Sequence, residues 1–89
     1  MGEWTKFMPA TAETQDIADK VKVAAEEKLS MKFEVYKAFE YQSQVVAGMN
    51  YRINVQISNL PGNAELGVFQ NLEHEYALTS AKLLPTDKK

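Results

Sequence analysis

Cysteine is absent from the 89 residues of this chain. Its absence excludes disulfide bonds, thiolate metal ligands and a cysteine nucleophile, and it is typical of a reducing compartment. Long hydrophobic runs are absent too, so the sequence predicts no membrane span. Residues 1–8 lack the apolar stretch of a secretory signal, because Glu3 interrupts them early. We therefore expect a cytoplasmic protein.

Positive charge, glycine and histidine are also scarce. The net charge is -2 and the basic residues are scattered, so we expect neither a nucleic acid nor a membrane as the partner. The four glycines do not form a phosphate-binding loop. The only histidine, His74, precedes Glu75, but an H-E-x-x-H zinc motif would need a second histidine where Leu78 stands. The sequence therefore predicts no metal, no cofactor and no enzymatic activity.

The length and composition predict one domain over residues 1–89 with a single small hydrophobic core. Residues 1–9 form an N-terminal trunk without periodicity, which Pro9 ends because proline disfavours helix in the residue before it. Residues 11–29 have the period of an amphipathic helix, and its N-cap is Thr11 or Thr14. The positions expected to face the core are Ile17, Ala18, Val21, Ala24, Ala25 and Lys28 or Leu29.

Residues 32–84 show the two-residue period of antiparallel strands. In the clearest strand, apolar side chains from Met49 to Ile57 alternate with polar ones from Asn50 to Ser58, which predicts one buried and one solvent-exposed face. Further strands are expected over residues 64–70 and 76–83. The preceding strand should place on one face Phe33, Val35, Phe39, Tyr41 and Val45. Together these segments predict an α+β fold, in which one helix packs across a four- to five-stranded antiparallel sheet.

The turn between the first two long strands is unusually apolar. It reads Gln44-Val45-Val46-Ala47-Gly48, whereas a tight turn is ordinarily built from Asn, Asp, Ser and Gly. Either these valines form the buried end of a strand, or another molecule covers an exposed tip. Alternate turns of a meander lie at the same edge of a sheet, so this tip should lie beside the second hairpin tip, Leu72–His74.

Three segments of the chain follow the order of a known family. They are Pro9–Val21, then Gln42–Gly48 with Asn50-Tyr51 after it, and then Val68–Leu72 with His74-Glu75 after it. These segments resemble the start of the helix, the first hairpin and the approach to the second hairpin of the stefins (type 1 cystatins). The resemblance implies the cystatin-like fold. It also implies a reversible, tight-binding competitive inhibitor of papain-like cysteine proteases such as cathepsins.

The resemblance further implies a binding surface. Stefins insert an N-terminal trunk with a glycine and two hairpins into the protease cleft, and they occlude it without being cleaved. Carried onto this sequence, the protease-binding residues are Gly2, Gln44, Val45, Val46, Ala47, Gly48, Leu72, Glu73 and His74. Glu73 stands where stefins usually have proline, which predicts a less rigid second tip.

The sequence leaves three alternatives open for Trp4, which is unexpected in the trunk. Trp4 packs on the protease, on its own sheet or on neither.

The function and the oligomeric state have alternatives too. A non-inhibitory binding module on the same scaffold is the alternative function. The protein should be mostly monomeric, with a domain-swapped dimer as a hazard, formed when two copies exchange the helix and the first strand.

Overall fold

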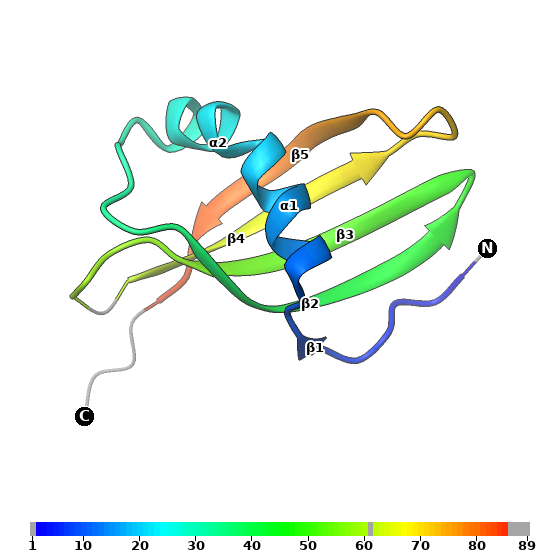
Figure 1. Ribbon diagram of the computed structural model, residues 1–89, viewed down its shortest axis with the longest axis horizontal. Coiled ribbons are helices and arrows are strands. Elements are labelled where there is room, and N and C mark those ends of the chain that lie inside the picture. Colours follow the sequence, from blue (N-terminus) through cyan, green and yellow to red (C-terminus); the bar gives the residue numbers. More distant parts are fainter. Residues whose placement is uncertain (1, 61, 86–89) are drawn as a thin grey trace.

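The computed structural model describes residues 2–60 and 62–85, which form one antiparallel sheet with helices across one face (Figure 1). The elements are β1 (Met8–Pro9), α1 (Ala12–Lys20), α2 (Lys22–Leu29), β2 (Lys37–Val46), β3 (Gly48–Gln56), β4 (Asn63–Gln70) and β5 (Tyr76–Leu83). The strands lie in the order β1-β2-β3-β4-β5, and neighbouring strands are antiparallel. The predicted α+β fold is confirmed, and its fifth strand comes from the trunk. Residues 1, 61 and 86–89 of the predicted domain lie outside the described part.

The N-cap of α1 is Thr11, and Thr14 stands at the third helical position. The Thr14 N–H donates to Oγ1 of Thr11 (3.2 Å), and the Thr11 N–H donates to Oγ1 of Thr14 (3.1 Å). This reciprocal arrangement is a capping box, which satisfies an N–H group that the first helical turn leaves without a partner. Of the two N-cap candidates that the sequence left open, Thr11 is the N-cap, and Thr14 completes the capping box.

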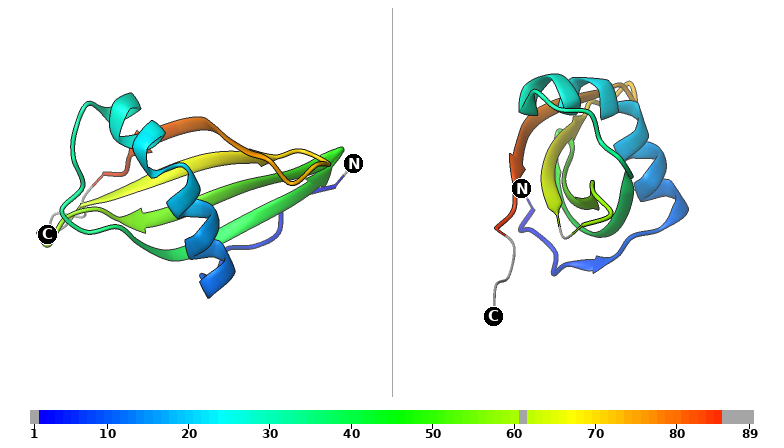
Figure 2. Two further views of the ribbon diagram at one scale, coloured as in Figure 1. Left: turned by 45° about the horizontal axis from the view of Figure 1, so that its top comes forward. Right: turned by 90° about the vertical axis from the view of Figure 1, so that its left-hand side faces the viewer.

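The predicted single helix over residues 11–29 is wrong, because the chain breaks at Val21 (φ -113°, ψ 14°). The break turns α2 toward β5, so that the helical segment follows the twisted sheet (Figure 2). As a result Ala25 is fully buried, whereas Ala24, which the periodicity placed toward the core, is exposed. Packing on the sheet, and not the local period, decides which alanine is covered.

The core lies between the helices and the sheet. Its largest fully buried side chains come from the two central strands: Ile53, Val55, Leu66 and Val68. The alternation predicted for residues 49–58 is confirmed on the apolar face, where Ile57 is buried as well. On the other face one residue departs from it, because Asn54 is only 6% exposed and its Nδ2 donates to Oε2 of Glu40 (2.7 Å).

The first long strand begins later than its sequence predicts. β2 begins at Lys37, four residues after Phe33. A β-bulge between Ala38 and Glu40 leaves Phe39 as an extra residue opposite β3. Phe39 is therefore exposed, contrary to the predicted alternation, and Ala38 is buried in its place. A bulge reverses the face of the residues before it, which a two-residue period cannot anticipate.

Candidate functional site

The trunk and both hairpin tips lie at one end of the sheet (Figure 1). The β2–β3 hairpin ends in Gln44–Gly48, and the β4–β5 hairpin ends in Leu72–His74. Pairing of β3 with β4 holds the two hairpins side by side. The Gly2 N–H donates to the Val45 carbonyl oxygen (2.9 Å), which holds the trunk against the first hairpin. The fold thus brings together all the predicted site residues, called the wedge residues below: Gly2, Gln44–Gly48 and Leu72–His74.

The first tip presents apolar side chains to solvent. Val45 is 59% exposed and Ala47 is exposed, whereas Val46 is partly buried. The interpretation of this segment as the buried end of a strand is therefore wrong for Val45 and Ala47. β2 and β3 reach beyond the helices here, so no helix covers the tip, and Val45 and Ala47 stay exposed (Figure 2). An apolar tip that its own fold leaves uncovered is typical of a contact surface.

Gly48 is required at the base of this tip for two reasons. Its φ of +118° lies in a region that side chains with a Cβ rarely adopt. A Cβ would also collide with the Gln70 carbonyl oxygen and press on the Phe69 ring, both of which belong to β4. The first tip can therefore lie this close to the second hairpin only with glycine at position 48.

Gln44 joins the trunk to the first hairpin. Its Nε2 donates to the Gly2 carbonyl oxygen (3.1 Å), and its Oε1 accepts from Nδ2 of Asn50 (2.9 Å). Gly2 itself lies so close to β2 that a Cβ would stand 2.9 Å from the Val45 carbonyl oxygen. The absence of a side chain at position 2 therefore lets the trunk approach the hairpin.

The second tip is held by a residue that the sequence interpretation missed. Oδ1 of Asn71 accepts from the backbone N–H groups of Glu73 and Glu75 (both 2.9 Å), and the Asn71 carbonyl oxygen accepts from the His74 N–H (3.0 Å). Leu72, at 74% exposure, projects from this turn. The signal was available, because an asparagine at the start of a turn commonly accepts from backbone N–H groups further along it.

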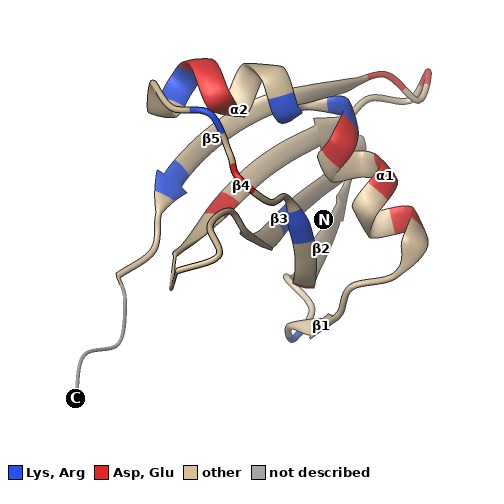
Figure 3. Cartoon of the chain, turned by 60° about the vertical axis from the view of Figure 1, so that its left-hand side comes forward, with Lys and Arg blue, Asp and Glu red and all other residues tan. Residues whose placement is uncertain are grey.

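Negative charge is present at this end of the molecule. Figure 3 shows acidic residues on the second hairpin tip and along the outer side of α1. They include Glu73 and Glu75 in the turn and Glu13 at the start of the helix. Within the described residues, the second hairpin has one ion pair, in which Nζ of Lys82 lies 3.7 Å from Oε1 of Glu65. This pair lies far from the tip. The tip therefore presents one leucine among carboxylates.

His74 is linked to the interior through two side chains. Its Nδ1 lies 2.7 Å from Nε2 of Gln70, and Oε1 of Gln70 accepts from the Tyr51 hydroxyl (3.2 Å). Burial raises the pKa of Tyr51, and nearby phenols and Glu13 raise it further. The phenol therefore stays protonated and serves as the donor that fixes Gln70.

Two absences apply to the described residues. Across residues 2–60 and 62–85, no three His, Asp or Glu side chains gather in a way that could hold a metal ion. No helix in this part of the chain is both long and apolar enough to cross a membrane.

A twisted antiparallel sheet crossed by a helix, with a trunk and two hairpin tips at one end, defines the cystatin class of fold. The family model described as the cystatin domain matches residues 2–87, and the chain therefore belongs to the cystatin family. It is 55% identical over 82 residues to cystatin-B of Bos taurus, which covers 89% of this chain and 83% of the relative.

Further relatives are named stefin-C and cystatin-B. Stefin-C of Bos taurus is 48% identical over 83 residues, covering 90% of this chain and 81% of the relative. Cystatin-B of Homo sapiens is 54% identical over 67 residues, covering 75% and 67%. The resemblance to stefins is thus confirmed, and with it the expectation that the chain is an inhibitor and not an enzyme.

Proposed function

We propose that this protein is a reversible, tight-binding competitive inhibitor of papain-like cysteine proteases, and that the wedge residues enter the active-site cleft. The observation that carries the proposal is the uncovered apolar tip, where Val45 is 59% exposed and Gly48 allows the close approach of β4. Membership of the cystatin family supports the same activity.

Burial of apolar surface supplies the affinity. Val45, Ala47 and Leu72 are exposed in the free protein and would lose water in a cleft, at about 25 cal/mol per Å² of apolar area. The hydrogen bonds of Gln44 and Asn71 hold both tips in shape before binding, which lowers the ordering cost of association. Gln44 therefore acts through Gly2 and Asn50, as a positioning residue.

The hairpin also explains why the inhibitor would stay intact. A protease cleaves an extended segment whose carbonyl carbon lies within about 3.5 Å of the nucleophile. The first tip is instead a tight turn whose flanking residues, Val46 and Gly48, pair with each other across β2 and β3. Such a turn fills the cleft without offering a peptide bond in the required geometry, so inhibition is by occlusion.

The remaining site residues have smaller roles in this proposal. Glu73 and His74 lie beside Leu72 at the rim of the contact, where exposed charges contribute about 0–1 kcal/mol. A cytoplasmic location and a monomeric working state belong to the same proposal. The alternative of a non-inhibitory binding module is not favoured, because no residue of the first tip departs from the stefin pattern that the resemblance implies.

A titration of papain tests the proposal. Papain at nanomolar concentration is mixed with increasing amounts of the purified protein, and hydrolysis of a fluorogenic peptide is followed. We expect stoichiometric loss of activity, recovery on dilution, and an inhibitor of unchanged mass by mass spectrometry. Full papain activity in the presence of the folded protein at micromolar concentration would refute the proposed function.

A further inference from the structure

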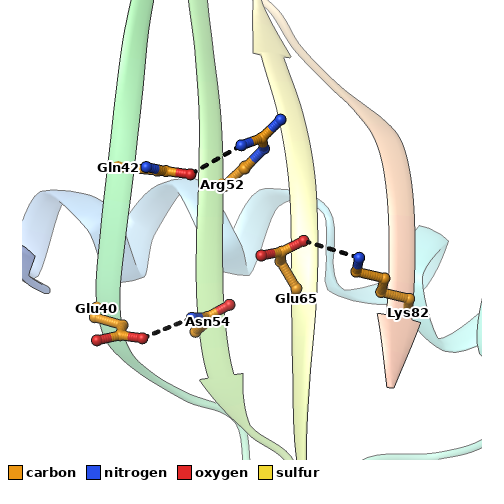
Figure 4. Close-up of polar contacts among 6 residues, drawn as sticks. All are labelled: Glu40, Gln42, Arg52, Asn54, Glu65 and Lys82. Atoms are coloured by element: carbon orange, nitrogen blue, oxygen red, sulfur yellow. Dashed lines mark hydrogen bonds and ion pairs between the residues drawn. The ribbon is translucent and has the colours of Figure 1, made fainter. Parts of the chain in front are cut away.

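The face of the sheet that points away from the helices carries a polar side-chain network. Figure 4 shows three contacts on this face: Gln42 with Arg52, Glu40 with Asn54, and Glu65 with Lys82. The first contact differs from the others because it continues into the trunk. Gln42 is only 9% exposed, which is unusual for a glutamine on the outer face of a sheet.

Trp4 stacks on Arg52. Cζ of the Arg52 guanidinium lies 4.0 Å from the centroid of the Trp4 ring, within the range of a cation–π contact. Trp4 belongs to the trunk and Arg52 to the middle of β3, so the contact crosses the whole width of β2. A tryptophan in the trunk therefore has a partner on the sheet in the free protein.

A second set of contacts closes this arrangement into a ring. Nη1 of Arg52 donates to Oε1 of Gln42 (3.0 Å), and Nε2 of Gln42 donates to the Thr5 carbonyl oxygen (2.8 Å). Thr5 follows Trp4 in the chain, and its N–H donates to the Ser43 carbonyl oxygen (2.9 Å). The trunk is thus held by a stacked ring at Trp4 and by hydrogen bonds at Thr5, and the two anchors share Arg52 and Gln42.

We propose that Trp4 and Arg52 form a clamp that orders residues 2–5 against β2 before any protease binds, and so positions Gly2 beside the first hairpin. The inference rests on the proposed inhibition and adds a device within it. Trp4 and Arg52 are positioning residues, since they act through the trunk and not through contact with the protease. The three alternatives left open for Trp4 reduce to packing on its own sheet.

The clamp has a consequence for affinity. A free trunk would have to be ordered during association, and an already ordered one would not. Loss of either partner should therefore weaken inhibition without altering the core. The effect should be the same whichever partner is removed, because each is needed for the stack.

Trp4 is the only tryptophan, so its fluorescence reports on the clamp in the free protein. Arg52→Ala should shift the emission to longer wavelength and increase quenching by acrylamide, because the indole face becomes exposed to water. Hydrogen exchange at the Thr5 amide should accelerate in the same variant. Lys82→Ala is the matched control, since Lys82 is an exposed cation on the same face whose partner is Glu65. Unchanged fluorescence and exchange in Arg52→Ala would overturn the inference.

Papain inhibition tests the functional half of the clamp in a double-mutant cycle. Trp4→Ala and Arg52→Ala should each raise the inhibition constant about threefold to tenfold, the double variant should add little more, and thermal unfolding should stay near that of the unchanged protein. Trp4→Phe, which keeps an aromatic face, should retain most of the affinity for papain that Trp4→Ala loses.

Two results of the cycle would overturn the clamp. A loss in Trp4→Ala with none in Arg52→Ala would mean that Trp4 contacts the protease directly. Unchanged inhibition in both variants would mean that the stack of Trp4 on Arg52 does not contribute to inhibition. Failure of the unchanged protein to inhibit is a separate result, which refutes the proposed function, while the fluorescence and exchange measurements still decide whether the trunk is clamped.

Discussion

At the scale of single residues, the wedge end combines exposed apolar side chains with a close approach of the backbone at Gly48. Val45, Ala47 and Leu72 are apolar and exposed, although neighbouring strand residues such as Val55 and Val68 are fully buried. Scattered exposed apolar residues are ordinary, but a group of them at one end of a sheet is typical of a contact site. Gly48 lies between the two tips, and the backbone of β4 leaves no space for a side chain there.

Val46→Asp is expected to weaken inhibition of papain by tenfold or more, about 1.4 kcal/mol, because the carboxylate would lose water in the cleft. Inhibition constants from a fluorogenic assay check this, with circular dichroism to verify the fold. Val23→Asp is the matched control, since Val23 is an exposed valine on α2, away from the wedge residues. Equal inhibition by Val46→Asp and the unchanged protein would contradict the placement of the first tip.

At the scale of elements, the second hairpin tip and the start of α1 depend on side chains that accept from the backbone. Asn71 holds the second tip through its Oδ1, and Thr11 with Thr14 caps α1. The loop between α2 and β2 is fixed in the same way, because Oε2 of Glu26 accepts from the Phe33 N–H (2.9 Å). Local polar contacts therefore set the shape of connections that hydrophobic burial does not fix.

Asn71→Ala should loosen the second tip, because two backbone N–H groups lose their acceptor. We expect a loss of about 1 kcal/mol in the free energy of unfolding and about threefold weaker inhibition of papain. Urea unfolding and inhibition constants measure the two effects. Asn59→Ala, at an exposed asparagine in the connection between β3 and β4, is the control. If the second tip depended on Leu72 alone, the unchanged protein, Asn71→Ala and the control variant would inhibit papain equally.

Tyr36 gives the connection between helix and sheet a pH dependence. Its hydroxyl donates to the Ala18 carbonyl oxygen (2.6 Å), and its pKa is raised by burial first and then by the carboxylates of Asp19 and Glu26. A raised pKa in the folded state means that the stabilising contribution is complete below the ordinary pKa of about 10. The contribution is then lost as the pH rises above that value.

Tyr36→Phe should therefore lower the free energy of unfolding at pH 8 by about 1 kcal/mol, through the lost hydrogen bond. The unchanged protein should lose more stability than Tyr36→Phe between pH 9 and about pH 11. Urea unfolding of both proteins at several pH values, followed by the fluorescence of Trp4, provides the comparison. Parallel pH profiles would show that the phenol does not contribute in this way.

At the scale of the whole molecule, the fold assembles a rigid end from three parts of the chain. Backbone hydrogen bonds tie Gly2 to β2, and the pairing of β3 with β4 ties the two hairpins together. A binding end that is already assembled can be tight with an interface of about 800 Å² per partner. The same assembly depends on the turn at Ala47, because a straightened β2–β3 segment would have no first tip.

A domain-swapped dimer should therefore inhibit poorly. Exchange of the helices and β2 between two copies would straighten the chain at Ala47 and remove the first tip from both copies. We expect the monomer from size-exclusion chromatography to inhibit papain stoichiometrically, and any swapped dimer to be at least about tenfold weaker. Equal inhibition by the two species would show that the turn at Ala47 is not needed.

Local patterns were sufficient wherever one face of an element meets the core along its whole length. The alternation from Met49 to Ile57 predicted β3, because Ile53, Val55 and Ile57 belong to the same core and Tyr51 packs against it. The patterns failed where the contact surface changes direction. The break at Val21 and the bulge before Glu40 each shift the buried face, and neither leaves a proline or glycine in the sequence as a signal.

The sequence by itself determined the α+β class, the apolar first tip and the absence of cysteine chemistry, because these follow from residue type and from contacts within a few positions. Only the tertiary structure decided which distant residues meet. Trp4 stacks on Arg52, and Gly48 lies against Gln70. The physical reason is that strand register and trunk placement are fixed by pairing between segments tens of residues apart, and no local period encodes that pairing.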